Sequence, residues 1–359
     1  MQELRVTFRI ASSLGTPFQA DTIFGHICWA LHYLEGDDAV SEFLAEYSKN
    51  DSPPLLVSDG FPEVDGLRYL PRPNMPTSFR EVSTDLGIKQ DDLAEWRIFT
   101  SAAKSLDKKP YVEESVLLAH ADPLDNAGIA SDVFALKVCP ETMAPIDRQV
   151  CNCERWQDCP ALGGNAQRVC KVVPLRCVET ATMHNVINRW KCSSENLYAR
   201  REWFTNYGFY FLARIDDKIM TKDRLAACME YIEGSGYGRD RSTGMGAIRD
   251  VKIEDVDREA VKDANGFINL SSAYVPRCGE LGRGFYSVHV KRGKLGEGYI
   301  HTYSPFKRPV LMIEAGAVLE GDPCVVHGGL ISGVHYQAPE IVQYGYAYPL
   351  AVKIDEKAL

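Results

Sequence analysis

The sequence lacks any apolar run long enough to cross a membrane, and it has more acidic than basic residues. Its 359 residues include 40 Lys and Arg against 49 Asp and Glu, which gives a formal net charge of −9. This balance argues against a protein that coats nucleic acid without selection, although it leaves room for a local basic groove. The first residues, MQELRVTFRI, lack the form of a signal peptide, so we expect a cytoplasmic protein with no membrane partner.

Repeats of fixed period are also missing, and so are the two common phosphate-binding patterns. The run GSGYGRDRSTGMGAIRD (234–250) is rich in glycine, but it has no Lys for a Walker A loop. Arg241 stands where a Rossmann pattern needs its third glycine, and both patterns need a strand before and a helix after. Bare backbone amides beside Arg239, Arg241 and Arg249 suit an extended nucleic-acid backbone. The alternative is a glycine-rich connector with solvated arginines.

Charge is sorted along the chain. Nine acidic residues and one basic residue lie between Glu35 and Asp65, whereas seven basic and two acidic residues lie between Pro276 and Arg308. This pattern predicts an anion-binding face and an acidic face, and the acidic face is either solvated or in contact with a protein partner.

Hydrophobic periodicity predicts a mixed α+β fold. Residues 4–11 and 206–216 alternate like strands, and 245–256 resumes a strand pattern. Helical spacing follows Asp21, a candidate cap, up to Gly36, and returns at 221–234 with Gly234 as the stop. These elements give the β-α-β…β-α-β order of a ferredoxin-like fold. Gly25, inside the first helix, predicts close approach of another backbone.

The loop GYGRDRSTGMG resembles the glycine-rich loop of the RAMP superfamily, the repeat-associated RNA-binding proteins of CRISPR–Cas systems. GTPFQADTIFGHICWAL (15–31) resembles more narrowly the Cas5 group of type III effectors, the group of subunit four of the Csm complex. Three further stretches resemble the same group: SDGFPEVDGLRYLPRPNMP (58–76), HNVINR (184–189), and KRPVLMIEAGAVLEG with YGYAYPL near the end. The resemblance covers most of the chain except roughly 80–180.

This resemblance implies two ferredoxin-like (RRM-like) RAMP domains with a Gly-rich loop and a cysteine-rich insertion. The first would span 1–256, with a thumb-like insertion at about 136–205, and a smaller RAMP-like domain would span 257–359. It also implies a non-catalytic subunit that holds the 5′ repeat-derived tag of the CRISPR RNA. The implied protein partners are the large polymerase/cyclase subunit and the first backbone RAMP subunit of a type III effector complex in antiviral defence, with target RNA met only indirectly.

The same resemblance implies which residues meet the RNA. In the loop they are Gly236, Gly238, Arg239, Arg241, Ser242, Thr243, Gly244 and Gly246. On the first helix they are Thr22, Gly25 and His26, and on the thumb they are His184, Asn185 and Arg189. Aromatic and basic residues interleave around the thumb, as single-stranded RNA requires. For Trp203 and Phe204, however, we favour a place in the core.

Five cysteines are crowded into CNCERWQDCPALGGNAQRVCKVVPLRC. Four thiolates in about twenty residues can close a tetrahedral zinc site, and the ligands would be Cys151, Cys153, Cys159 and Cys170. Cys177 competes with Cys170 for the fourth place. We expect a structural zinc ion that braces the insertion, with an iron–sulfur cluster as the alternative.

Two other functions remain open. RAMP proteins of the Cas6 group cut precursor CRISPR RNA with a general acid–base histidine, which makes an endoribonuclease the alternative, with His26 and His184 as candidates. No second acid or base is adjacent to either histidine at a recognisable spacing. The third possibility is an assembly protein whose contact with RNA is incidental.

Overall fold

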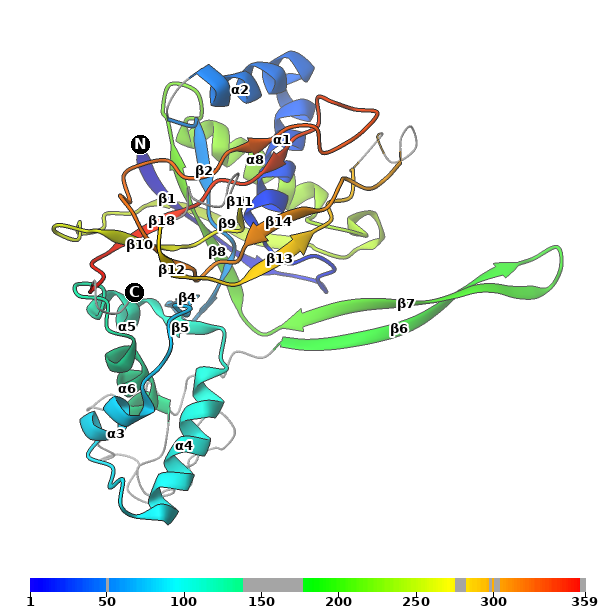
Figure 1. Ribbon diagram of the computed structural model, residues 1–359. Helices are drawn as coiled ribbons and strands as arrows, with labels where there is room; N and C mark the ends of the chain where they lie inside the picture. The colour runs from blue at the N-terminus through cyan, green and yellow to red at the C-terminus, as the bar shows by residue number, and fades with distance from the viewer. Residues whose placement is uncertain (50–51, 138–176, 275–281, 297–298, 300–303, 356–359) are drawn as a thin grey trace. The chain divides into compact units, whose positions relative to one another are not determined.

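The computed structural model describes residues 1–49, 52–137, 177–274, 282–296, 299 and 304–355 (Figure 1). The chain divides into two compact units, Met1–Pro62 with Leu175–Val256, and Glu63–Pro174 with Asp257–Leu359. Val256 also ends the predicted first domain, whereas Glu63–Pro174 belongs to the second unit. The predicted RAMP domains remain a prediction, because a compact unit defined by contacts need not coincide with an evolutionary domain.

Unit 1 contains two strand–helix–strand segments, and the sequence predicts their elements except the helix at 37–49 and the strand at 55–57. The first segment comprises β1 (Gln2–Ile10), α1 (Ala20–Glu35), α2 (Asp37–Lys49) and β2 (Leu55–Val57). The second comprises β8 (Gly208–Ile215), α8 (Lys222–Ser235) and β9 (Ile248–Asp255). β1 pairs antiparallel with β8 and β9, and β8 pairs antiparallel with β2 (Figure 1). The predicted α+β class is confirmed by these helices and antiparallel sheets.

The core of unit 1 follows from the alternation along β1. Leu4, Val6 and Phe8 are each at most 1% exposed, because every second side chain of the strand points to the same face. Ile27 and Leu31 of α1 are fully buried, at the helical spacing of one face. This packing fixes the ends of β1 and α1, and thereby the connector between them, Ala11 to Gln19.

Two helix ends differ from the sequence prediction. Asp21 lies in the first turn of α1 and is not its cap; the Ala20 N–H donates instead to Asp59 Oδ1 at 2.7 Å. The carboxylate that satisfies this helix end therefore comes from after β2. α8 passes through Gly234 and ends at Gly236, whereas Gly36 ends α1 as predicted.

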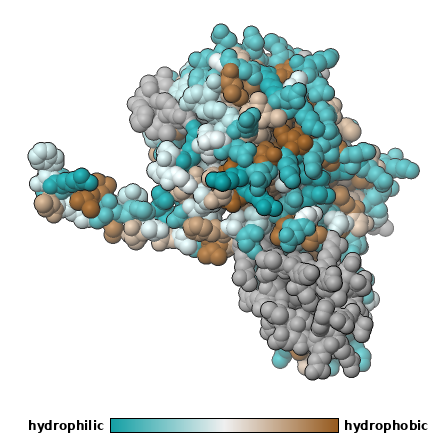
Figure 2. All heavy atoms as spheres, turned by 180° about the vertical axis from the view of Figure 1, so that it is seen from behind, coloured by the Kyte–Doolittle hydropathy of each residue, from teal (hydrophilic) through white to brown (hydrophobic). Residues whose placement is uncertain are grey.

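The described part of the predicted insertion is a long hairpin of β6 (Cys177–Asn188) and β7 (Ser193–Thr205), which projects from unit 1 (Figure 1). Its register runs from Cys177↔Thr205 to Asn188↔Ser193, with an irregularity between His184 and Val186. Figure 2 shows hydrophobic side chains at the surface of this hairpin, and most of its residues are exposed. The hairpin is therefore held mainly at its base.

Unit 2 combines a helical cluster with small antiparallel sheets. The helical part has α3 (Phe79–Asp85), α4 (Leu93–Asp107), α5 (Glu114–Ala119) and α6 (Asn126–Lys137), with β4 (Leu67–Pro71) and β5 (Tyr111–Glu113) beside them in the chain. Val82, Phe99, Leu106 and Phe134 share its core. β3 (Phe61–Val64) crosses the boundary between the units in sequence.

The C-terminal part of unit 2 is strand-rich. One sheet has the order β12-β15-β10-β18, another β11-β14-β13, and β16 pairs with β17. The bounds are β10 (Gly266–Asn269), β11 (Ala273–Tyr274), β12 (Gly284–Phe285), β13 (Val288–Lys291), β14 (Val310–Ile313), β15 (Val318–Glu320), β16 (Leu330–Ile331), β17 (Gln343–Tyr344) and β18 (Pro349–Val352). None of the helices in the described ranges has the length and apolar character of a membrane span.

The long-range cap of α1 gives a stability prediction. Asp59→Ala removes the acceptor of the Ala20 N–H, so we expect the free energy of unfolding to fall by about 1 kcal/mol. Urea unfolding of the full chain measures this change. Asp217→Ala, at an exposed position, is the matched control, and an equal loss in both variants would contradict the capping role.

Candidate nucleic-acid interface

The glycine loop, residues 236–246, joins α8 to the segment that leads into β9. Gly246 has a φ of +67°, and a Cβ at this position would lie 1.8 Å from the Tyr237 carbonyl oxygen. A Cβ at Gly238, where φ is +78°, would lie 2.7 Å from Thr16 Cβ. These two glycines therefore make room for the protein's own atoms on the side where a Cβ would lie, and their contact with RNA stays a prediction.

The two ends of the loop close on the interior of unit 1. The Tyr237 N–H donates to the Gly246 carbonyl at 2.8 Å, and the Gly246 N–H donates to the Ser13 carbonyl at 2.8 Å. The Tyr237 ring is buried, stacks on Phe18 with centroids 4.3 Å apart, and donates its hydroxyl to the Pro17 carbonyl at 2.9 Å. Burial also raises the pKa of Tyr237, so the ring stays neutral. The tyrosine thus anchors the loop to the connector.

The middle of the loop faces solvent. Arg239, Asp240, Ser242, Thr243 and Gly244 are exposed. The chain makes a short turn at Arg241–Thr243, and in the part of the chain that the structure describes no atom lies within 4 Å of a Cβ placed at Gly244. The open part of the loop therefore offers two hydroxyl groups and a backbone that a ligand can approach.

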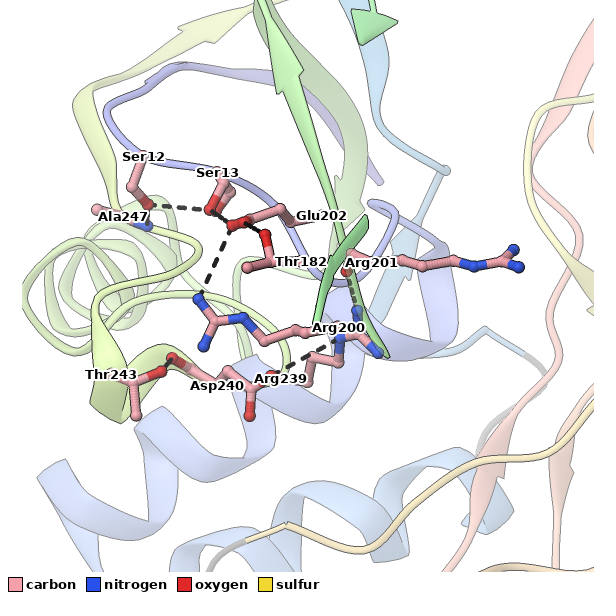
Figure 3. Close-up of polar contacts among 10 residues, drawn as sticks. All are labelled: Ser12, Ser13, Thr182, Arg200, Arg201, Glu202, Arg239, Asp240, Thr243 and Ala247. Atoms are coloured by element: carbon pink, nitrogen blue, oxygen red, sulfur yellow. Dashed lines mark hydrogen bonds and ion pairs between the residues drawn. The ribbon is translucent and has the colours of Figure 1, made fainter. Parts of the chain in front are cut away.

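The two loop arginines are tied to neighbouring segments of unit 1, and Figure 3 shows the contacts of Arg239. The Arg239 guanidinium donates to the Arg201 carbonyl of β7 and lies 3.9 Å from Asp240 Oδ2. The Arg239 N–H donates to Thr16 Oγ1 at 3.1 Å, and Arg241 Nη1 donates to Ser235 Oγ at 3.2 Å. Arg239 keeps 48% of its side chain exposed, so it can contact an anion without leaving the loop.

His26 supports the loop from α1. Its Nε2 accepts a hydrogen bond from the Gly238 N–H at 2.9 Å, and its ring lies 4.7 Å from the Tyr237 ring. Burial, with a smaller contribution from the Arg241 guanidinium, lowers the pKa of His26 to about 3. The ring is therefore neutral at physiological pH with one nitrogen already engaged, which disfavours a role as general acid or base.

The other two residues of α1 that were predicted to meet RNA, Thr22 and Gly25, have different surroundings. Thr22 is half-buried, and its hydroxyl donates to Asp21 Oδ1 at 3.3 Å. Gly25 was predicted to admit another backbone, and for the described residues that prediction is wrong, because none of their atoms lies within 4 Å of a Cβ placed there. The loop instead approaches the helix at the next residue, His26.

The base of the hairpin joins the same network. Leu14 and Trp203 exchange two backbone hydrogen bonds of 2.8 and 2.9 Å, which fasten β7 to the connector. Ser13 Oγ donates to Glu202 Oε2 at 2.5 Å, and Arg200 Nη2 lies 3.9 Å from the same oxygen (Figure 3). The connector, the loop and the hairpin base thus form one polar cluster.

The predicted thumb residues lie away from this cluster. His184 stacks on Tyr198 with centroids 5.5 Å apart, and Tyr198 lies about 17 Å along β7 from Trp203 at the strand rise of about 3.4 Å per residue. Asn185 Nδ2 donates to Ser194 Oγ at 2.8 Å, and Arg189 is exposed in the turn of the hairpin. The structure therefore separates these three residues from the glycine loop.

The aromatic residues of the hairpin also differ from expectation. Phe204 is 46% exposed, so its predicted place in the core is wrong, whereas Trp203 is half-buried. Trp190, in the hairpin turn, is 99% exposed. Exposed rings beside Arg189 and Lys191 are available for stacking.

The predicted zinc ligands Cys151, Cys153, Cys159 and Cys170 lie outside the described residues. Cys177 is exposed at the start of β6, and desolvation followed by the Glu179 carboxylate raises the pKa of its thiol. Within the described ranges, no group of three or more His, Cys, Asp or Glu side chains could hold a metal ion.

Sequence reasoning missed the connector residues that position the loop. Ser13 and Thr16 bind across to Glu202 and Arg239, and Asp59 holds the start of α1. The only signal is the hydroxyl-rich run SSLGTP between a strand and a helix. The partners of Ser13 and Thr16 lie 189 and 223 positions further along the chain, so a local sequence pattern could not reveal them.

Comparison with family models gives no match, and comparison with curated proteins gives none either. Solved structures do match. A chain of a Csm3–Csm4 subcomplex of the type III-A CRISPR–Cas interference complex aligns with a TM-score of 0.60 at 14% identity, covering 99% of this chain and 100% of that one. Chains of Csm1–Csm4 cassettes in complex with pppApA and with cA4 align over the same shares with TM-scores of 0.51, at 15% and 17% identity.

Csm4 is the protein that these assemblies have in common. The chain has the Csm4 fold. The resemblance to subunit four of the Csm complex is therefore confirmed at the level of the fold, and this fold spans both units. At these identities the likeness establishes architecture, and the function is argued separately below.

The depressed pKa of His26 predicts an acid-dependent loss of stability. An unfolded histidine titrates near about 6.5, so between that value and about 3 unfolding takes up a proton. The stabilising contribution is complete above pH of about 6.5 and is lost as the pH falls toward 3. His26→Gln keeps an acceptor for the Gly238 N–H but does not titrate. We expect the wild type to lose up to about 2 kcal/mol more than this variant between about pH 7.5 and about pH 5, measured by urea unfolding. Equal losses would contradict the assignment.

Proposed function

We propose that the chain is a non-catalytic CRISPR RNA-binding subunit of a type III, Csm-type effector complex, and that its glycine loop holds the 5′ tag of the RNA. The observation that carries the proposal is the exposed middle of the loop on a rigid base. Ser242, Thr243 and Gly244 face solvent, while Tyr237 and His26 fix the loop from beneath. Hydroxyl groups, backbone amides and a half-exposed arginine are the groups that bind RNA phosphates.

The fold supports the proposal from a second direction. Strand–helix–strand segments that pair antiparallel in unit 1 fit a ferredoxin-like RAMP domain, with the glycine loop between α8 and β9 as in that superfamily. The strand-rich C-terminal residues would form the smaller RAMP-like domain. The open position over Gly25 on α1, beside His26, leaves room for the ligand that the resemblance implies.

The hairpin would supply further contacts to the RNA. His184 and Tyr198 form a stacked pair on one face, and Asn185, Arg189 and Trp190 follow toward the turn. Aromatic rings stack on splayed bases while cations meet the phosphates between them. The hairpin would thus extend the RNA path outward from the loop.

The proposed protein partners are a large polymerase/cyclase subunit and a first backbone subunit. Support comes from the solved relatives of the same fold, which are assemblies of Csm4 with Csm1 or with Csm3. An exposed acidic surface at the start of α2, with Asp37 and Asp38, is available for a basic partner.

The structural zinc ion also stays a proposal. Four cysteine thiolates form a complete tetrahedral ligand set with no open position, so the ion would stabilise the insertion and take no part in chemistry. We expect about one zinc ion per chain by elemental analysis of the purified protein, and Cys151→Ser with Cys153→Ser to lose it. Cys324→Ser, at an exposed cysteine outside the cluster, is the control. An unchanged zinc content in the double variant would contradict this ligand set. Bound iron in place of zinc would indicate the alternative, an iron–sulfur cluster.

The loop is tested by its salt dependence. We expect Arg239→Ala with Arg241→Ala to weaken binding of tag-containing RNA to the full chain and to lower the salt slope by about one unit per lost phosphate contact. Fluorescence anisotropy at several salt concentrations measures both quantities. Arg9→Ala is the matched control, because Arg9 is an exposed arginine of β1 that lies 3.9 Å from Asp250 Oδ2. An unchanged slope in the double variant, or an equal change in the control, would show that the loop is not the phosphate grip.

The same incubations separate the scaffold from an endoribonuclease. We expect the RNA to remain intact on a gel without added metal ions. Cleavage that disappears in His26→Ala or His184→Ala would replace the proposal with a Cas6-like activity. If the chain binds its protein partner independently of salt and has no affinity for RNA alone, it would be an assembly protein.

A further inference from the structure

The basic segment near the C-terminal end has no part in the function proposed above. Between Lys291 and Arg308 the chain has five Lys and Arg residues and one Glu. β13 and β14 pair antiparallel at one end of this segment. The pairing continues beyond them, because the Leu295 N–H donates to the Pro305 carbonyl and the Lys307 N–H to the Gly293 carbonyl, both at 2.8 Å. The described residues of the segment thus belong to one extended hairpin in unit 2.

Two aromatic rings are exposed on this hairpin and beside it. Phe306 is 60% exposed and lies opposite Lys294 in an isolated β-bridge. Tyr336 is 82% exposed, and the Arg308 guanidinium carbon lies 3.7 Å from its ring centroid. Arg308 therefore covers one face of the tyrosine, in a cation–π pair. We call Lys294, Phe306, Arg308 and Tyr336 the basic–aromatic strip.

The strip is rigidly supported. The Arg308 N–H donates to the Val334 carbonyl at 2.7 Å, which fixes the segment before Tyr336 to the hairpin. His335, 5% exposed, contacts the Ser304 carbonyl through Nε2 at 2.9 Å, and its Nδ1 accepts from the Ala338 N–H at 3.2 Å. The backbone around Tyr336 is therefore fixed, so a ligand that stacks on its ring has little of the chain left to order.

We propose that the basic–aromatic strip is a second binding surface for single-stranded nucleic acid, separate in residues from the glycine loop. Exposed rings interleaved with cations are the combination that binds single strands, because the rings stack on bases and the cations track the phosphates. A base within a duplex does not present its face to such rings. The excess of positive charge, in a chain of net charge −9, complements a polyanion.

The test uses the full chain and a fluorescein-labelled oligouridine, which lacks any tag sequence. We expect Lys294→Ala with Arg308→Ala to lower the salt slope of binding by about 1.4, at about 0.7 per phosphate contact for a single strand. Tyr336→Ala should weaken binding roughly tenfold, as expected for one lost base stack, with little change in slope. Arg283→Ala is the matched control, because Arg283 is an exposed arginine of the same unit that is paired with Glu320 at 3.1 Å.

A second set of variants separates the effect of the strip on RNA binding from that of the glycine loop. In a chain carrying Arg239→Ala and Arg241→Ala, the strip substitutions should retain their full effect on oligouridine binding, whatever happens to binding of the tag. Thermal unfolding checks that every variant is folded, and Phe306→Ala provides a second stacking variant should Tyr336→Ala fail this check.

Three outcomes would overturn the proposal. The first is oligouridine binding by the strip variants with wild-type affinity and slope. The second is an effect of Arg283→Ala as large as that of the strip variants, or binding of a blunt RNA duplex as tight as that of oligouridine. The third is wild-type RNA binding by strip variants that no longer co-purify with a protein subunit, which would assign the surface to protein recognition.

Discussion

Close packing between Gly246 and the Tyr237 carbonyl is the constraint on which the candidate interface depends. A side chain at position 246 would displace that carbonyl, and with it the ring that stacks on Phe18. Both ends of the loop are therefore fixed to the connector between β1 and α1, and only the middle is free to meet a ligand. Glycine serves here to close the protein on itself, and the exposed site is a consequence of that closure.

One polar cluster then connects three segments that are far apart in the sequence. Ser13 and Thr16 from the connector meet Glu202 at the hairpin base and Arg239 in the loop, and Arg239 also reaches the Arg201 carbonyl. A ligand that draws Arg239 toward a phosphate would compete with this last contact. Binding of a phosphate by the loop, as proposed, would therefore be linked to the attachment of the hairpin through the Arg239 side chain.

The histidines illustrate how tertiary surroundings select between chemical roles. From the sequence, His26 and His184 are equal candidates for a general acid–base group. In the structure His26 is half-buried and accepts a hydrogen bond from the loop, and its lowered pKa keeps the ring neutral, whereas His184 is stacked on Tyr198 of the hairpin. Each arrangement fits a supporting or stacking role better than proton transfer.

The sequence by itself determined the α+β class, the elements β1, α1, β8, α8 and β9 of unit 1 and the place of the glycine loop, because hydrophobic periodicity and glycine position are local properties. The hydroxyl-rich connector, the cap that Asp59 provides for α1, and the exposure of Phe204 were decided only by the tertiary structure. The residues that contact the connector and the start of α1 lie tens to hundreds of positions away in the sequence. A local pattern carries no information about which distant segment will be adjacent. The same reason explains Gly25: its helical position was evident from sequence, but the empty space above it was not.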